Sequence, residues 1–539
     1  MKKTPPLIWP VLILLIIAGI FYLDKTMPIG TDVSFYLDFS SLLFRGEKFL
    51  IDFFDYRVPL FPLLFSAVYK MGWGDFANRW LMLFSIYSFY GLTLYFISLS
   101  LTRSPIKSFT AVLLVLVSIS ARQFDHGRDI GIPLFYHTAE LAGLFFLFKA
   151  IFHRPSFTFK RILFFSILSG MLFGVAFIGR PVHIIIPLVV AGTAVYRLYK
   201  KKKEEMVNNT RPAIFGFLTG LGLSSIIVFL FFYVPETHFL SLAKKWLWEI
   251  PPVIYKAEPL RIIKKLITTL YWGWPEIRNI HLPLFWFTYV LSAAGLAVFL
   301  FSESAQNIGS KISSFYQKNR ALFLFVLLMG FMAVTTVLMT GSGAKSHEAP
   351  FFSFYFFVLI LILSNIKLKE QLKSWKIYLF IVVFFLPHSV DFAKKELKIY
   401  LIDRANQADA FLPERVAAEL KKLAKAKDPV LILGAYPTVT RLADYRPFMG
   451  QTNDIFLYSG HKFFEENYQE NLAKEMEKVN VAYKLFDYPN LKALSGIRED
   501  ESNPVYLYIE KYLKEKFTVA AIVENSQLQK VIIYRRKFK

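Results

Sequence analysis

The chain has 539 residues, of which 55% are hydrophobic and 17% aromatic, and its mean hydropathy is +0.42. This composition excludes a disordered chain and an ordinary cytosolic enzyme, because a water-soluble fold cannot bury so much apolar surface. The absence of cysteine excludes disulfides, thiolate metal sites and cysteine nucleophiles. The net charge of +23 does not indicate nucleic-acid binding, because the basic residues gather in short loops between apolar segments. The chain is therefore predicted to be a polytopic α-helical membrane protein.

Apolar runs long enough to span a bilayer recur along the chain. We predict about eleven transmembrane helices, at 7–23, 77–101, 108–121, 132–152, 162–179, 182–198, 213–234, 282–302, 321–340, 350–366 and 376–392. The first run follows Lys2 and Lys3 without a signal-peptide cleavage site, so we expect it to remain as an anchor. Gly170-x-x-x-Gly174 and Gly216-x-x-x-Gly220 are typical of close helix packing.

Lysine and arginine far outnumber acidic residues in alternate short loops, which predicts that these loops and the N-terminus are cytoplasmic. The loops are 1–6, 102–108, 153–161, 197–211, 303–320 and 367–376. The loops 24–76 and 235–281 and the tail 393–539 are then external, and periplasmic in a Gram-negative cell. We expect 1–392 to form a transmembrane domain in a bacterial inner (cytoplasmic) membrane. Residues 393–539 are expected to form an external domain.

The first external loop combines apolar helical spacing with charged residues. Phe35, Phe39, Leu42 and Leu43 predict an amphipathic helix in the membrane interface. A second short helix is predicted from Pro59 to Met71, after a polar turn that contains Gly46, Asp52, Asp55 and Arg57. From this loop alone, Asp32 is better interpreted as a helix N-cap than as a catalytic carboxylate.

The loop 235–281 and the tail have patterns of their own. Lys244 and Lys245, beside Trp246 and Trp248, are typical of a basic helix that rests on anionic lipid, and a lid over a lipid phosphate is the alternative. In the tail, helices and strands alternate, which predicts a small α/β domain. Helices are expected at 405–426, 462–479 and 506–516, and strands at 429–434, 481–486, 518–523 and 531–534.

Several catalytic signatures are missing from the sequence. It contains no P-loop, no Gly-x-Gly-x-x-Gly after a strand and no Gly-x-Ser-x-Gly elbow. It also lacks Asp-x-Asp, and His347-Glu348 lacks the second histidine of a zinc-protease helix. These absences disfavour ATP-driven transport and nucleotide-sugar chemistry, and no zinc site is predicted.

Motifs in chain order resemble the GT-C superfamily of membrane glycosyltransferases, which use polyprenyl-phosphate sugars and include protein O-mannosyltransferases and the aminoarabinose transferases of lipid A. The first loop, with Asp32, Tyr36, a glycine and a Pro-Leu helix, is similar to theirs. The later matches are the Gly-rich span 170–181 that ends in Arg-Pro, the loop 341–350, and the tail segments 431–437 and 442–447. The resemblance covers nearly the whole chain.

The resemblance implies an inverting transfer to an acceptor hydroxyl, with Asp32 as the catalytic base. Such a reaction needs one base and cations for the departing phosphate. The residues expected to bind substrate are Tyr36, Asp55, Arg57, Asp125, Arg128, Asp129, Arg180, Lys256, Lys345, His347 and Glu348. A solvated loop salt bridge with Arg122 or Arg128 is an equal alternative for Asp125 and Asp129. The alternative interpretation of Arg180 is that its side chain extends toward lipid headgroups.

Two departures from the family pattern leave the sugar and any divalent-cation requirement open. Val33 stands where many relatives have a second carboxylate, and Arg57-Val58-Pro59 replaces Lys-Pro-Pro. The expected partners are a polyprenyl-phosphate (in bacteria, undecaprenyl-phosphate) sugar donor, a lipid, glycan or protein acceptor, and membrane lipids, without nucleic acid. The alternative is a non-enzymatic transporter or flippase of a lipid or lipid-linked saccharide. The predicted spans contain few ionisable groups, with Glu140 as the main exception, which favours the enzyme.

Overall fold

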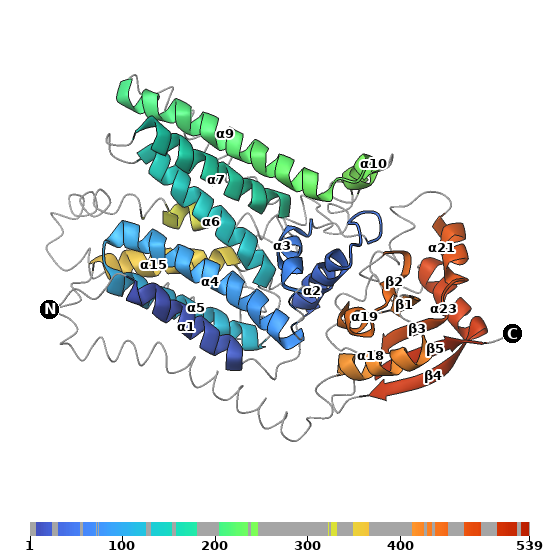
Figure 1. Cartoon of the computed structure of the whole chain (residues 1–539). Coiled ribbons are helices and arrows are strands. Elements are labelled where there is room, and N and C mark those ends of the chain that lie inside the picture. The colour runs from blue at the N-terminus through green and yellow to red at the C-terminus, as the bar shows by residue number, and fades with distance from the viewer. Residues whose placement is uncertain are drawn as a thin grey trace. The chain divides into compact units, whose positions relative to one another are not determined.

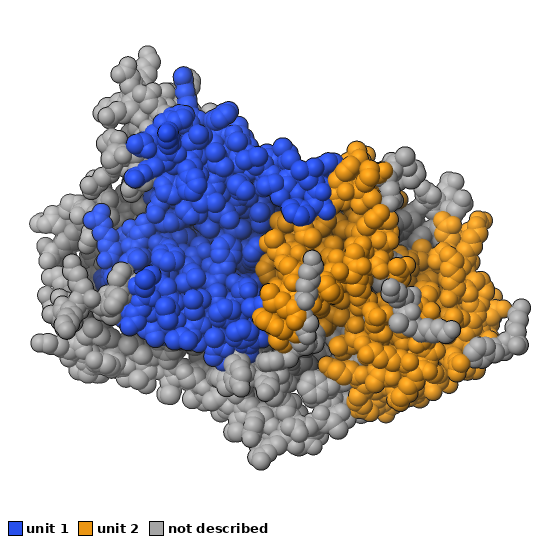
Figure 2. Space-filling view, viewed as in Figure 1, with its two compact units in different colours: residues 1–25, 80–231, 255–397 blue, residues 26–79, 232–254, 398–539 orange. Residues whose placement is uncertain are grey.

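The computed structural model describes most of the chain (Figure 1). The described residues are 7–23, 31–53, 58–69, 71, 73, 75–125, 131–152, 158–179, 204–235, 239–245, 249, 322, 325–330, 332, 349–365, 412–424, 428–433, 437–450, 468–486, 504–524 and 530–537. They belong to two compact units, which Figure 2 colours separately. Unit 1 draws on 1–25, 80–231 and 255–397, and unit 2 draws on 26–79, 232–254 and 398–539. The first external loop thus belongs to the same unit as the tail.

Unit 1 is helical. Its described helices are α1 (Ile8–Leu23), α4 (Asp75–Thr102, in unit 1 from Trp80), α5 (Pro105–Asp125), α6 (Gly131–Phe152), α7 (Phe159–Gly179), α9 (Glu204–Phe232, in unit 1 up to Phe231) and α15 (Ala349–Asn365). Each coincides with a predicted span, although α9 starts earlier than expected. Residues 204–211, predicted as part of a loop, form its first two turns, and Pro212 lies inside the helix.

Three described helices are long and apolar enough to cross a membrane: Trp80–Thr102, Phe159–Gly179 and Arg211–Phe232. The outward side chains of α9 are apolar as well, since Phe215, Leu218 and Leu230 are each more than half exposed. An apolar face turned outward suits lipid rather than water. The spans predicted at 182–198, 282–302 and 376–392, and most of 321–340, lie outside the described residues. The described part therefore supports a membrane protein without fixing the number of spans.

Glycines set the spacing of α7 and α9, as the two Gly-x-x-x-Gly motifs predicted. A Cβ atom on Gly170 would collide with the backbone carbonyl of Phe217, and one on Gly220 with that of Ile167. A Cβ on Gly174 would collide with Ser224 on α9. Because the obstacles at Gly170 and Gly220 are backbone atoms, no rotamer change removes them. The two helices approach backbone to backbone.

Unit 2 begins with the first external loop. Helix α2 (Thr31–Phe44) ends in a turn at Gly46, whose φ of 84° is readily adopted only by glycine. Helix α3 (Leu60–Tyr69) follows and packs against α2, and the hydroxyl of Tyr69 donates a hydrogen bond to the carbonyl of Leu37 (3.2 Å). Both helices were predicted. A short helix, α10 (Phe239–Lys244), also belongs to this unit and lies in the second long loop.

The exposed polar face expected for an amphipathic α2 is not what the structure shows. Every side chain from Tyr36 to Leu42 is buried, including the polar side chains of Asp38, Ser40 and Ser41. An amphipathic helix lying on a membrane would leave its polar face in water. Here α3 and the tail helix α19 (Pro437–Ala443) contact α2, so its polar side chains are enclosed as well.

The tail forms a five-stranded sheet of order β2-β1-β3-β5-β4. Strands β1 (Pro429–Leu433), β2 (Arg446–Pro447) and β3 (Val481–Phe486) are parallel to one another, whereas β5 (Lys530–Arg536) is antiparallel to both β3 and β4 (Phe517–Glu524). The four predicted strands are confirmed. The predicted helices are confirmed within shorter bounds, as α18 (Leu412–Leu423), α21 (Tyr468–Met476) and α23 (Pro504–Lys516). Helix α19, strand β2 and the 3₁₀ turn η7 (Phe448–Gly450) were not predicted.

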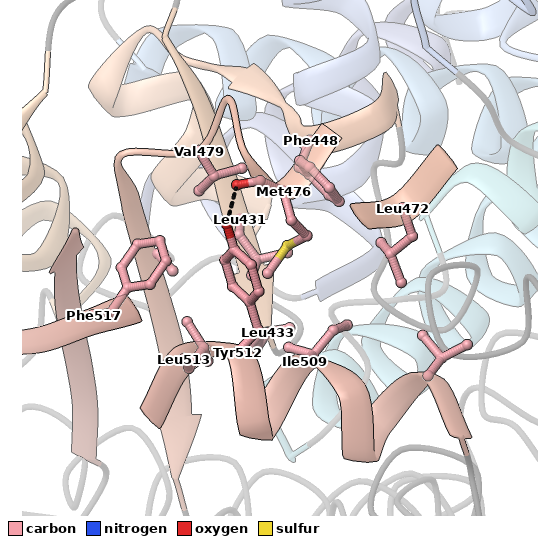
Figure 3. Packing of buried hydrophobic residues seen from close by; sticks show 12 residues of the cluster. Leu431, Leu433, Phe448, Leu472, Met476, Val479, Ile509, Tyr512, Leu513 and Phe517 are labelled. Carbon is pink, nitrogen blue, oxygen red and sulfur yellow. Dashed lines mark hydrogen bonds between the residues drawn. The ribbon is translucent and has the colours of Figure 1, made fainter. Parts of the chain in front are cut away.

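Helices cover both faces of this sheet. Alternate strand residues enter two separate apolar clusters: Val430 and Tyr483 pack with α18 and α19, whereas Leu431 and Ala482 pack with α21 and α23. Figure 3 shows the second cluster, in which the ring of Tyr512 lies among aliphatic side chains and its hydroxyl donates to the carbonyl of Met476 (3.4 Å). A sheet with two buried faces gives the tail a core of its own.

Candidate functional site

The proposed base, Asp32, lies in the first turn of α2, as its second residue. The helix starts at Thr31, so Asp32 is inside the helix rather than in front of it. The described part gives its backbone position only. Tyr36 follows one helical turn later and is buried, with its ring edge-on to Phe39 at a centroid distance of 6.0 Å. The backbone carbonyl of Tyr36 accepts a hydrogen bond from Ser40 Oγ (2.9 Å).

Aromatic side chains pack around α2. The rings of Phe39 and Phe53 stack at 5.7 Å, and those of Phe44 and Tyr69 stack at 6.2 Å. Phe49 lies between Phe53 (5.6 Å) and Phe232 (5.6 Å). Aromatic pairs of this kind stabilise a fixed arrangement by more free energy than their buried apolar area alone would provide. The helix that begins with Asp32 is therefore a packed element of unit 2.

A buried ion pair joins α2 to the tail. Arg441 on α19 donates from Nε to Asp38 Oδ1 at 2.9 Å, and their side chains are only 6% and 8% exposed. Burial is the largest influence on the Asp38 carboxyl and raises its pKa from 3.8 to about 7, although Arg441 and then Arg45 act to lower it. Burial and the nearby Asp38 charge likewise raise the pKa of the Tyr69 hydroxyl to about 12. The Asp38 carboxyl thus titrates near neutral pH.

Two further ion pairs lie at the edge of the same contact. Arg45, just after α2, pairs with Asp444 at 2.8 Å, and Glu47 pairs with Arg446 at 3.3 Å. Asp444 ends α19 with a φ of 62°, the left-handed conformation that commonly closes a helix. These pairs are more exposed, since the side chains of Asp444 and Arg446 are 51% and 57% accessible. Exposed pairs add little to stability, so the buried pair dominates the contact.

A second polar cluster lies inside unit 1. His137 and Glu140, both on α6 and fully buried, approach with Nδ1 and Oε2 3.7 Å apart. His137 Nε2 is 2.7 Å from Ser353 Oγ on α15, and that hydroxyl is 3.0 Å from the hydroxyl of Tyr90 on α4. This cluster links three helices through polar contacts in an apolar surrounding.

The other predicted site residues contribute no side-chain geometry. Asp125 is the last residue of α5, and only its backbone is described. Outside the described residues lie Asp55, Arg57, Arg128, Asp129, Arg180, Lys256, Lys345, His347 and Glu348. Within the described ranges, no group of three His, Asp or Glu side chains could hold a metal ion.

The pairs between α2 and α19 were missed by the sequence analysis. One signal was available: Asp38 interrupts the run of apolar residues from Phe35 to Phe39, and a carboxyl in an apolar run needs a buried partner. The identity of that partner could not be read, because Arg441 is 403 positions away. The tail segment 442–447, noted for its family resemblance, begins directly after Arg441 and contains both Asp444 and Arg446.

No protein-family model matches the chain, and no curated protein matches its sequence. Among solved structures, the chain is similar to "Crystal Structure of ArnT from Cupriavidus metallidurans bound to Undecaprenyl phosphate", with 13% identity, a TM-score of 0.43, and coverage of 97% of this chain and 98% of that one. The apo state of the same protein gives 12% identity, a TM-score of 0.41 and 97% coverage of both chains. The Archaeoglobus fulgidus oligosaccharyltransferase in its apo form gives 11% identity and a TM-score of 0.44, over 88% of this chain and 69% of that one. At TM-scores below 0.5 these similarities fix neither the activity nor the substrate.

Proposed function

We propose that the chain is an inverting membrane glycosyltransferase, which transfers a sugar from a polyprenyl-phosphate donor to an acceptor hydroxyl at the outer face of the cytoplasmic membrane. The observation that carries the proposal is the arrangement of the first loop. An apolar helix, α1, is followed by a helix with Asp32 in its first turn, a glycine turn and a second short helix, α3. The sequence resemblance leads to the same order.

The chemistry needs little more than a base and cations. The Asp32 carboxylate takes the proton of the acceptor hydroxyl while the acceptor oxygen bonds to the anomeric carbon. The bond from that carbon to the phosphate oxygen breaks on the opposite face, and polyprenyl phosphate leaves with the electron pair. A position in the first turn of a helix favours the ionised form of a carboxyl group, because backbone N–H groups there are unpaired within the helix. A general base must be ionised, so the position suits the role.

Basic side chains of the external loops would receive the phosphate. Arg57, Arg180, Lys256, Lys345 and His347 are the proposed cations, each placed by the sequence in or next to an external loop. Fixed positive groups stabilise the charge that develops on a leaving phosphate. Asp55, Asp125, Arg128, Asp129 and Glu348 are the proposed contacts to the sugar and the acceptor. The burial of Tyr36 favours a supporting role beneath the site for this residue.

The first experiment supplies labelled polyprenyl-phosphate sugars to membranes that contain wild type, Asp32→Asn or Asp52→Asn. Asp52 is the matched control, an exposed aspartate of the same loop that accepts a hydrogen bond from the backbone N–H of Lys48 (2.7 Å). We expect label to reach an acceptor with wild type and Asp52→Asn. Asp32→Asn should reduce the rate by about 10²- to 10⁴-fold, the usual contribution of a general base. Transfer by Asp32→Asn at a near-normal rate would eliminate Asp32 as the base.

A transporter of a lipid-linked saccharide is the second candidate. The observation that favours it is the buried His137–Glu140 pair in α6, because ionisable groups within apolar helices often belong to proton relays. The same membranes separate the two functions. If no donor yields a transferred sugar and labelled donor instead crosses the membrane equally with wild type and Asp32→Asn, the transporter replaces the enzyme.

A further inference from the structure

Helix α2 has two ends with different roles. Its first turn contains Asp32, and its second half contacts α19 through Asp38. At 1.5 Å per residue, these two aspartates lie about 9 Å apart along the helix axis. Because a helix transmits tilt and translation as a rigid rod, whatever holds Asp38 also sets where Asp32 lies.

The contact between α2 and α19 includes a direct hydrogen bond between two buried ionisable side chains. Asp38 and Arg441 are both almost fully buried, and Arg441 Nε donates a hydrogen bond directly to Asp38 Oδ1. Removing one member of such a pair leaves a buried charge without its balance, whereas surface pairs are removed at little cost. A buried pair also restricts the two helices that it joins to one relative position, so it fixes how α2 lies on α19.

We propose that Arg441 is a positioning residue for the transfer reaction: through Asp38 it fixes α2 on the tail helix α19 and so sets the position of Asp32. This inference rests on the proposed function. Through this contact, the tail becomes a working part of the catalytic apparatus. The two edge pairs, Arg45–Asp444 and Glu47–Arg446, add a weaker constraint around the buried one.

The first test compares two arginines that differ in burial. Arg441→Ala and Arg446→Ala each remove a guanidinium that pairs with the first loop, but the side chain of Arg441 is 6% exposed and that of Arg446 is 57% exposed. We expect Arg441→Ala to lower kcat by about 10- to 100-fold, the range that a small displacement of a catalytic group produces. The KM for the donor should stay within about two-fold of the wild-type value, because the buried Arg441 side chain is proposed to act through Asp38 rather than on the donor. Arg446→Ala should keep both constants close to wild type. Equal effects of the two variants on kcat would contradict the proposal.

The second test replaces the ion pair with a covalent link. The chain contains no cysteine, so Glu47→Cys with Arg446→Cys gives a single reactive pair at the edge of the contact. Bifunctional thiol reagents of increasing length should join the two positions in folded protein, and should not join them after denaturation in detergent. In the Arg441→Ala background, the link should restore most of the lost kcat, because it holds α2 on the tail without the ion pair.

Each outcome separates one claim from another. Failure of the two cysteines to link in otherwise wild-type protein would show that α2 does not lie on the tail, and would overturn the inference whatever the activity. Linking without recovery of kcat would show that Arg441 acts on the reaction by another route. If the two cysteines link but the protein transfers sugar from none of the donors, the proposed function is overturned and the contact between α2 and the tail is still established. Arg441→Lys, which keeps the charge but loses the guanidinium geometry, should fall between wild type and Arg441→Ala if Arg441→Ala proves too unstable to purify.

Discussion

Asp38 makes the stability of unit 2 depend on pH. Its carboxyl faces Arg441 on α19, Arg45 after α2 and Tyr69 on α3, and burial outweighs the attraction of both arginines. The pKa of about 7 in the folded protein exceeds the value of 3.8 for an exposed aspartate. The folded state therefore binds a proton that the unfolded state releases between about pH 4 and pH 7.

This difference predicts how stability changes with pH. Below about pH 4 both the folded and the unfolded state bind the proton, and the contribution of Asp38 to the free energy of unfolding is at its largest. As the pH rises from about 4 toward 7, this contribution falls by about 1.4 kcal/mol for each pH unit. Wild type should therefore lose more thermal stability between pH 5 and pH 8 than Asp38→Asn, which cannot titrate. Asp444→Asn is the control, because it removes a half-exposed carboxyl from the same contact and should retain the wild-type pH dependence. Thermal midpoints measured at one scan rate test this. Parallel pH profiles for wild type and Asp38→Asn would contradict it.

At the scale of secondary-structure elements, the packing of α7 on α9 predicts opposite effects of an alanine substitution at two glycines of α9. A Cβ on Gly220 would strike the backbone of Ile167, whereas a Cβ on Gly222 would meet nothing within 4 Å. Gly220→Ala should force the helices apart and destabilise unit 1 by about 1–3 kcal/mol, the usual effect of overpacking. Gly222→Ala should be neutral or slightly stabilising, since alanine is the better helix former. Thermal unfolding in detergent provides the comparison, and a similar loss in both variants would show that backbone contact does not set the spacing.

The success of the sequence predictions depended on the length and regularity of each element. Apolar runs long enough for a span gave every described helix of unit 1. Strand β3 was predicted at its observed bounds because Val481–Phe486 is mostly apolar, with Lys484 as the exception, and has an ordinary strand length. Helix α19 was missed because it has only seven residues, among them Thr438, Val439 and Thr440, which are poor helix formers. Strand β2 has two residues, too few to show a period. The burial of the polar side chains of α2 was not predicted, because α19, which covers them, is distant in the sequence (Arg441 lies 403 positions after Asp38).

At the scale of the whole molecule, the sequence suggested a cut near 393, whereas unit 2 takes residues 26–79, 232–254 and 398–539 together. Hydropathy separates membrane from non-membrane segments, and it carries no information on which external segments pack against each other. The sequence therefore predicts the candidate site only as a set of residues in loops, and this set stays a prediction. Its support by α3 and α19 was not, because that support consists of contacts between residues far apart in the sequence.

The shared unit predicts what removal of the tail does to the first loop. A chain that ends at residue 397 lacks α19, so Tyr36–Leu42 lose part of their cover and Asp38 loses Arg441. We expect limited proteolysis of this truncated chain in membranes to cut within 31–69 at least ten-fold faster than in the full-length protein, since cleavage follows the opening of a segment. Full-length Arg446→Ala should resist cleavage as wild type does. An unchanged cleavage rate after truncation would mean that the loop holds its structure without the tail.

The separation of 403 residues between Arg441 and Asp38 also sets an order in time. At about 5–20 residues per second, a ribosome needs roughly 20 to 80 s to extend the chain from one residue to the other. During that interval the first loop has been synthesised, and the helix that will cover it has not. Unit 2 therefore closes only after α19 has been made, and the segment that contains Asp32 reaches its final packing long after it has been translated.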